Sequence, residues 1–161
     1  ISALVGKKKI MDTAQDTFVS SVAWTERVGF SAALAVINFD KKNKVFSHNN
    51  NTGKVIKSGW LRLAKKHSLK IEVNELNTVI SFNFTDKKNN EYLNTLFTEL
   101  MLKKNYLATN LLYISYYHKK TIVKKYLEAV DKTFFIISDS LKKNNRILQS
   151  KIRNYNYKRI K

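Results

Sequence analysis

The clearest pattern in the sequence is a helical spacing of apolar residues in three segments of the chain. Apolar side chains recur every three or four residues, which predicts amphipathic helices over about 55–67, 93–101 and 121–141. The apolar positions of the last two helices are Leu93, Leu96, Phe97, Leu100, Met101, Ile122, Val123, Tyr126, Leu127, Val130, Phe134 and Ile137. In the first helix we expect Trp60 to anchor the hydrophobic core.

Other segments alternate between apolar and polar residues, which is the pattern of a half-buried strand. Residues 69–73 and 79–84 predict two strands that flank a turn and pair in an antiparallel sheet. Residues 106–108 and 111–115 are shorter strand candidates. The second half of the chain is therefore predicted to combine a small antiparallel sheet with long helices.

The N-terminal part of the chain gives shorter signals. Residues 1–6 have the composition of a buried strand, and since nothing leads into it we expect the chain to begin within a domain. A polar loop is expected over 12–21. A helix is expected over about 31–41, whose small apolar residues lie on nearly every side and predict burial against neighbours. Residues 43–53 contain three consecutive asparagines and a glycine, which indicates either a break or a weak helix start.

The stretch 20–37 joins a polar loop to the small-residue helix. Thr25, Glu26 and Arg27 stand just before the helix. A hydroxyl and free backbone N–H groups meet there, so an anion can bind at this position. From the residues alone, the simpler interpretation of Thr25 is an ordinary capping or loop threonine.

Composition limits the class of protein. The 161 residues are enough for one domain with a real core, and a hydrophobic fraction of 43% favours a globular chain. Cysteine is absent, which excludes disulfides, thiolate metal sites and a cysteine nucleophile. No apolar run approaches the roughly 18–20 residues of a membrane span, and the N-terminus has no signal-peptide pattern. We therefore expect a cytoplasmic protein without a membrane partner.

The formal net charge of +18 needs its own interpretation. Lysines occur in every segment, usually beside asparagine, which favours a general compositional bias over a docking stripe for nucleic acid. The best candidate for a polyanion contact is the tail over 142–161, which carries eight basic residues, no acid, and the interleaved Tyr155 and Tyr157. For this tail we favour a frayed or partly helical terminus.

His67 lies at the expected end of the helix that contains Trp60. We expect it to interact with the last carbonyls of that helix, where a histidine is favourable. A metal-binding or catalytic role is ranked lower, because no second histidine or carboxylate lies at ligand spacing in the sequence.

The order of these elements, together with five short runs, resembles one enzyme family. The runs are 1–6 (ISALVG), 17–21 (TFVSS), 24–29 (WTERVG), 59–60 (GW) and 126–131 (YLEAVD). The chain resembles the C-terminal part of the class III pyridoxal-phosphate-dependent aminotransferases, and most closely their glutamate-1-semialdehyde aminomutase-like branch. The resemblance extends to about residue 141, and its first three runs are the most specific.

The resemblance implies an α/β fold, α+β in its C-terminal part, that forms the C-terminal portion of a fold-type-I transferase. Residues 1–44 would be the end of the large cofactor-binding domain, 45–141 the small C-terminal domain, and 142–161 a basic tail. The cofactor would be pyridoxal 5'-phosphate, held as a Schiff base by a lysine upstream of Ile1. The chain would then contain no catalytic residue, and by itself it would be inactive.

In this family a loop threonine hydrogen-bonds the cofactor phosphate of the neighbouring subunit, and Thr25 falls on that position. The resemblance therefore implies a homodimer with shared active sites. The reaction would be that of an aminotransferase (transaminase) or an aminomutase, acting on a small amino acid, keto acid or semialdehyde. Two residues depart from the family: Phe30 replaces a common proline at the helix start, and Ser68 replaces a common helix-ending glycine.

Two other functions stay open at this stage. The first is a small nucleic-acid-binding module that uses the basic tail at 142–161, although we rank nucleic acid below a small-molecule substrate. The second is a structural or interaction domain left from a degenerate enzyme.

Overall fold

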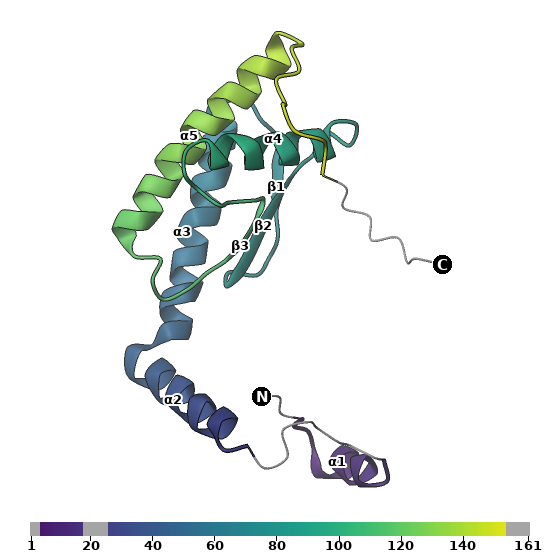
Figure 1. The fold of residues 1–161 in the computed structure, drawn as a ribbon, viewed down its shortest axis with the longest axis vertical. Helices are drawn as coiled ribbons and strands as arrows, with labels where there is room; N and C mark the ends of the chain where they lie inside the picture. The colour runs from purple at the N-terminus through teal and green to yellow at the C-terminus, as the bar shows by residue number, and fades with distance from the viewer. Residues whose placement is uncertain (1–3, 18–25, 154–161) are drawn as a thin grey trace. The chain divides into compact units, whose positions relative to one another are not determined.

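A computed structural model describes residues 4–17 and 26–153 of the chain (Figure 1). The chain divides into two compact units, unit 1 at residues 1–44 and unit 2 at residues 45–161. Among the described residues, unit 1 contains α1 and α2, and unit 2 contains the sheet with α3, α4 and α5.

Unit 1 is helical in its described residues. Helix α1 spans Lys8–Gln15, and the Lys8 ammonium pairs with the Asp12 carboxylate one turn later at 3.1 Å. The strand expected at 1–6 is wrong for residues 4–6, which have no strand pairing. The loop expected over 12–21 is wrong for residues 12–15, which belong to α1, and its residues 18–21 lie outside the described residues, as do residues 1–3 of the expected strand. A strand needs a neighbouring strand for its backbone groups. The strands of the described residues pair among themselves in unit 2.

Helix α2 spans Val28–Asn43, which confirms the helix expected over 31–41. Its expected burial is wrong for this chain, because no residue of α2 is buried. Phe30, Leu34 and Val36 are 59%, 61% and 67% exposed. A helix that is apolar on nearly all sides is typical of one surrounded by other protein, and the described residues provide no such surroundings.

Helix α3 spans Val45–Lys66 and follows a left-handed residue, Lys44, with φ 49°. The helix expected over 55–67 is confirmed, but it starts at Val45, so residues 49–53 are helical and do not form a break. The Asn77 amide donates a hydrogen bond to Asn50 Oδ1 at 2.9 Å. Tertiary contacts with the turn between β1 and β2 therefore override the weak local propensity of the asparagines.

The sheet has three antiparallel strands in the order β1-β2-β3. They are β1 at Ile71–Val73, β2 at Val79–Phe84 and β3 at Leu111–Tyr113. In the register Val73 lies opposite Phe82 and Val79 opposite Tyr113. The expected strand pair and the candidate at 111–115 are confirmed, whereas residues 106–108 are not a strand.

Lys57 of α3 holds the turn between β1 and β2. Its ammonium donates to three backbone carbonyls, those of Asn74 at 3.0 Å, Glu75 at 2.9 Å and Leu76 at 3.0 Å. An ammonium has three donors, so this arrangement uses all of them. The turn is thereby fixed against α3.

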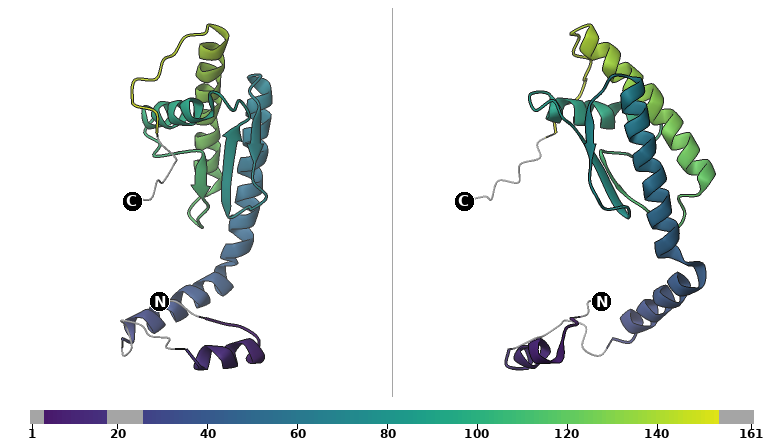
Figure 2. Two further views of the ribbon diagram at one scale, coloured as in Figure 1. Left: turned by 90° about the vertical axis from the view of Figure 1, so that its right-hand side faces the viewer. Right: turned by 180° about the vertical axis from the view of Figure 1, so that it is seen from behind.

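The core of unit 2 lies between the sheet and its helices. Helix α4 spans Asn90–Leu102 and α5 spans Lys120–Lys142, as the apolar spacing predicts. Helix α3 packs against β1, β2 and α5, while α4 packs against β2 and α5 (Figure 2). The Phe82 ring lies at the centre, 5.0 Å from the rings of Trp60 and Phe97 and 5.8 Å from that of Phe134. Trp60 is fully buried, which confirms its role as a core anchor.

Beyond α5, residues 145–153 form a strap that lies along α4. Backbone N–H groups of the strap find acceptors on α4: those of Gln149 and Ser150 donate to the Glu99 carboxylate at 3.1 and 2.9 Å, and that of Arg153 donates to the Thr95 hydroxyl at 3.0 Å. The frayed terminus that we favoured is therefore wrong for the strap. The rest of the basic tail, with Tyr155 and Tyr157, lies outside the described residues.

Candidate functional site

The start of α2 has the chemistry of an anion site. The Ser31 N–H makes the first helical hydrogen bond, to the carbonyl of Arg27 at 3.0 Å. Among the described residues no side chain caps this end of the helix, and its first turn contains no acid. Within the described residues, the N–H groups of Val28, Gly29 and Phe30 have no side-chain acceptor, and the positive end of the helix dipole favours an anion there.

Thr25, the predicted phosphate contact, lies outside the described residues, so its role stays a prediction. The adjacent Glu26 and Arg27 are exposed and bring one charge of each sign to the helix start. Backbone N–H groups without a carboxylate in the first turn are a donor set that fits a phosphate group. The described part of this site therefore fits the phosphate of the expected cofactor.

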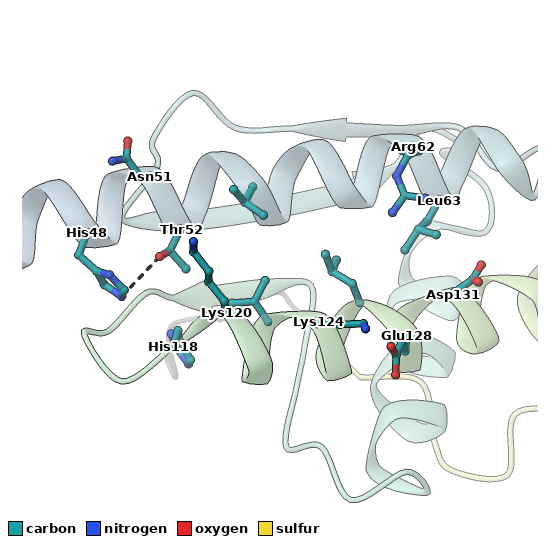
Figure 3. Close-up of a pocket in the computed structure, with 13 residues that line it drawn as sticks. His48, Asn51, Thr52, Arg62, Leu63, His118, Lys120, Lys124, Glu128 and Asp131 are labelled. Carbon is teal, nitrogen blue, oxygen red and sulfur yellow. Dashed lines mark hydrogen bonds between the residues drawn. The ribbon is translucent and has the colours of Figure 1, made fainter.

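A second candidate site is a groove between α3 and α5 (Figure 3). Its volume is about 650 Å³, and unit 2 supplies all of its lining. The apolar lining consists of Val55, Leu63, Val123 and Leu127. The polar lining includes two histidines, His48 and His118, and three cationic side chains, Arg62, Lys120 and Lys124. It also includes two acids, Glu128 and Asp131.

His48 of α3 and His118, which precedes α5, stand at one end of the groove (Figure 3). The His48 Nε2 atom lies 3.5 Å from the Thr52 hydroxyl. The Ser115 N–H donates to His118 Nδ1 at 2.9 Å. Burial holds the pKa of His118 below its usual value of 6.5, and the nearby His48 lowers it further. The neutral His118 ring therefore carries its proton on Nε2, because Nδ1 is the acceptor.

Asp131 stands at the other end of the groove, and the charge of its carboxylate is compensated by two partners. Its carboxylate accepts from Lys66 Nζ at 2.8 Å and from His67 Nε2 at 2.6 Å, and these two partners lower its pKa. The expected interaction of the His67 side chain with the last carbonyls of the helix is therefore wrong. The partner is a carboxylate on α5, distant in the sequence, while the His67 carbonyl accepts from the Ser138 hydroxyl at 2.7 Å.

None of the groove residues was singled out from the sequence as a site residue, although Val123 and Leu127 were placed on an apolar helix face. The usable signal was the start of the closing helix, where α5 has lysines and no acid in its first turn. Over residues 4–17 and 26–153, no group of three or more histidine, cysteine or acidic side chains can hold a metal ion. Within the same ranges, no helix has the length and apolar character to cross a membrane.

The sequence comparisons give one informative relative. No protein-family model matches the chain. Over 71 residues the chain is 34% identical to 2'-deamino-2'-hydroxyneamine transaminase of Streptomyces kanamyceticus. This match covers 44% of the chain and 18% of the transaminase.

The structural comparison gives a match over most of the chain. The solved structure is the PLP internal aldimine form of the FumI protein of Sphingopyxis sp. MTA144, and it matches with a TM-score of 0.74 and 19% identity. The match covers 86% of this chain and 34% of FumI. It confirms the predicted fold class, an α/β fold with a small antiparallel sheet packed with long helices, as one shared with part of a PLP-binding protein.

Proposed function

We propose that this chain is part of a pyridoxal-phosphate-dependent enzyme that transfers amino groups. The observation that carries the proposal is the 34% identity over 71 residues to a transaminase. The fold supports it, because the matching FumI structure is a PLP form. Since the matches cover 18% and 34% of these two proteins, the activity is proposed for a complete protein and not for this chain alone.

The start of α2 is the part of this chain that would bind the cofactor. When bound, pyridoxal phosphate supplies the electron sink that amino-group transfer needs. The Thr25 hydroxyl and the first N–H groups of α2 would hold the cofactor phosphate, and the helix dipole would add about 0.3–1 kcal/mol of stabilisation. In our proposal this phosphate belongs to the cofactor of the neighbouring subunit in a homodimer.

The finer assignment rests on the family resemblance. We place the complete protein among the class III aminotransferases, near the glutamate-1-semialdehyde aminomutase-like branch, in the cytoplasm. Transfer between two molecules and migration within one molecule both fit, with a small amino acid, keto acid or semialdehyde as substrate. Residues 1–44 are proposed as the end of the large domain and 45–141 as the small domain, with the lysine that holds the cofactor upstream of Ile1.

The first experiment tests the enzyme class. The gene is expressed with its upstream coding region, the protein is loaded with pyridoxal phosphate, and excess cofactor is removed. Borohydride should then fix the cofactor covalently to one lysine upstream of Ile1, which peptide mass spectrometry detects. A loaded protein without a modified lysine contradicts the proposal.

The second experiment tests the phosphate contact in the same complete protein. Thr25→Val should lower the cofactor retained per protomer after desalting, because the hydroxyl donor is lost. Thr25→Ser keeps a hydroxyl and should retain more cofactor than the valine variant. Thr17→Val, which removes a hydroxyl whose described partner is the Ala14 carbonyl, is the matched control and should retain as much cofactor as the parent. Equal retention in all variants removes Thr25 from the site.

A further inference from the structure

We propose that the groove between α3 and α5 binds a small organic anion, with its charged group held at the end formed by His48, His118 and Lys120. This inference concerns unit 2 alone and does not rest on the proposed amino-transfer function. The volume of about 650 Å³ lies within the range of small-molecule sites, which are concave, mostly apolar and carry a few placed polar groups.

The charge at the histidine end is positive and unbalanced. Lys120, the lysine at this end, has no hydrogen-bond or ion-pair partner in the part of the chain that the structure describes. In Figure 3 the Lys120 side chain extends from α5 toward α3, near Thr52. His48 stands close enough to His118 to lower the pKa of the His118 ring, in addition to the effect of burial. An anion bound here would accept hydrogen bonds from Lys120 and the histidine rings, and it would favour the protonated form of His118.

The N-terminus of α5 adds to the positive potential at the histidine end of the groove. Helix α5 begins at Lys120, its N-cap residue is Lys119, and no side chain of residues 4–17 or 26–153 caps it. Its first turn contains no acid, although acids are the stabilising residues at a helix N-terminus. The helix dipole therefore adds to the positive potential of the lysines instead of being compensated. Together with the groove, this charge gives a negatively charged ligand a defined position.

The opposite end of the groove fixes the direction of the ligand. Arg62, Glu128 and Asp131 gather there (Figure 3). Because Asp131 is paired with Lys66 and His67, Glu128 is the acid of this end without a described partner. Its carboxylate offsets the positive charge of Arg62 and Lys124 at this end, whereas neither acid of the groove lining stands at the histidine end. The negative group should therefore lie beside the histidines, and the apolar part of the ligand should lie over Val55 and Leu127.

Phenyl phosphate is a suitable probe, because it combines an anion with an apolar ring. Calorimetric titration of the 161-residue chain should show saturable binding. Burial of the ring should make phenyl phosphate bind about tenfold or more tightly than inorganic phosphate, and phenol should bind more weakly than phenyl phosphate. Absence of saturable phenyl phosphate binding, or equal affinity for the two phosphates, overturns the proposal.

Variants of the groove locate the binding. Lys120→Gln and His48→Gln should each weaken phenyl phosphate binding by about tenfold, the usual effect of losing one charge-assisted hydrogen bond. Val55→Thr keeps the shape of an exposed side chain and should weaken phenyl phosphate more than inorganic phosphate. Lys125→Gln is the matched control, an exposed lysine of α5 outside the groove lining, and should bind as the parent does. Equal losses in Lys120→Gln and Lys125→Gln would show nonspecific charge attraction and overturn the assigned position.

Discussion

The indole N–H of Trp60 donates a hydrogen bond to the phenol oxygen of Tyr126 over 3.1 Å and joins α3 to α5 in the core. The two side chains are 0% and 7% exposed. Burial holds the pKa of Tyr126 well above its usual value of 10, so the phenol stays neutral as an acceptor. This bond fixes the two helices that form the walls of the groove.

Tyr126→Phe should lower the free energy of unfolding by about 1–3 kcal/mol, because the buried indole N–H of Trp60 loses its acceptor. Urea unfolding followed by tryptophan fluorescence measures this change. Tyr113→Phe removes the hydroxyl of a tyrosine that is 67% exposed, and it should change stability by less than about 0.5 kcal/mol. Similar losses in both variants would mean that the buried bond contributes little.

Gly53→Ala should destabilise unit 2, because a Cβ at this position would overlap the backbone carbonyl of Asn77. Overpacking of this kind typically costs about 1–3 kcal/mol. Gly59→Ala is the matched comparison, because the alanine Cβ would lie 2.7 Å from the flexible end of the Leu127 side chain and not against backbone. Both substitutions gain the same helix propensity of about 1 kcal/mol, so their difference in unfolding free energy isolates the backbone clash. The expected order is a larger loss at Gly53, and the reverse order contradicts it.

Ser68→Gly should stabilise the chain by about 0.5–1 kcal/mol. Ser68 has a φ of 57° at the end of α3, a left-handed conformation that costs an ordinary residue about 1–2 kcal/mol and glycine almost nothing. Thermal unfolding measures the gain. Ser58→Gly, at an exposed position inside α3, should have the opposite sign because glycine is a poor helix residue.

The strap should release from α4 in acid. Partial burial raises the pKa of Glu99, but the hydrogen bonds from the Ser150 N–H, Lys103 and the Gln149 N–H outweigh it and hold the pKa below the usual 4.5. A lowered carboxyl pKa contributes stability above its unfolded value, and that stability is lost as the pH falls through the folded value. Hydrogen-exchange protection of the Gln149 and Ser150 amides should therefore fall as the pH drops below 4.5.

Glu99→Gln should reduce the hydrogen-exchange protection of the Gln149 and Ser150 amides already at neutral pH. It should also remove most of the pH dependence of this protection in acid. Glu91→Gln changes an exposed acid in the first turn of the same helix and should leave the strap protected. Protection that is unaffected by Glu99→Gln would show that the Thr95 hydroxyl and apolar packing hold the strap without the carboxylate.

The helical and alternating spacings of apolar residues predicted most of the secondary structure of unit 2. Leu93, Phe97 and Val130 recur at helical spacing, and they are buried on α4 and α5 as expected. The start of α3 was left open between a break and a weak helix start, because Asn50 and Gly53 are weak helix residues whose stabilising partner, the turn at Asn77, is distant in the sequence. Local propensity cannot register a contact of this kind.

The sites were less predictable than the helices. His67 and Asp131 pair at 2.6 Å although they lie far apart in the sequence, so a search for ligand spacing could not connect them. The same holds for His48 and His118, which only the packing of α3 against α5 brings to one end of the groove. The phosphate contact of Thr25 stays a prediction, and it came from the family resemblance and not from the local sequence.

The apolar surface of α2 determines how the chain should behave in solution. With a net charge of +18, molecules repel one another strongly at low ionic strength. Salt shortens this repulsion to about 10 Å at 0.1 M, while contacts between exposed apolar side chains are not screened. This chain should therefore become less soluble as salt is added, because the exposed apolar side chains of Phe30, Leu34 and Val36 can then associate between molecules.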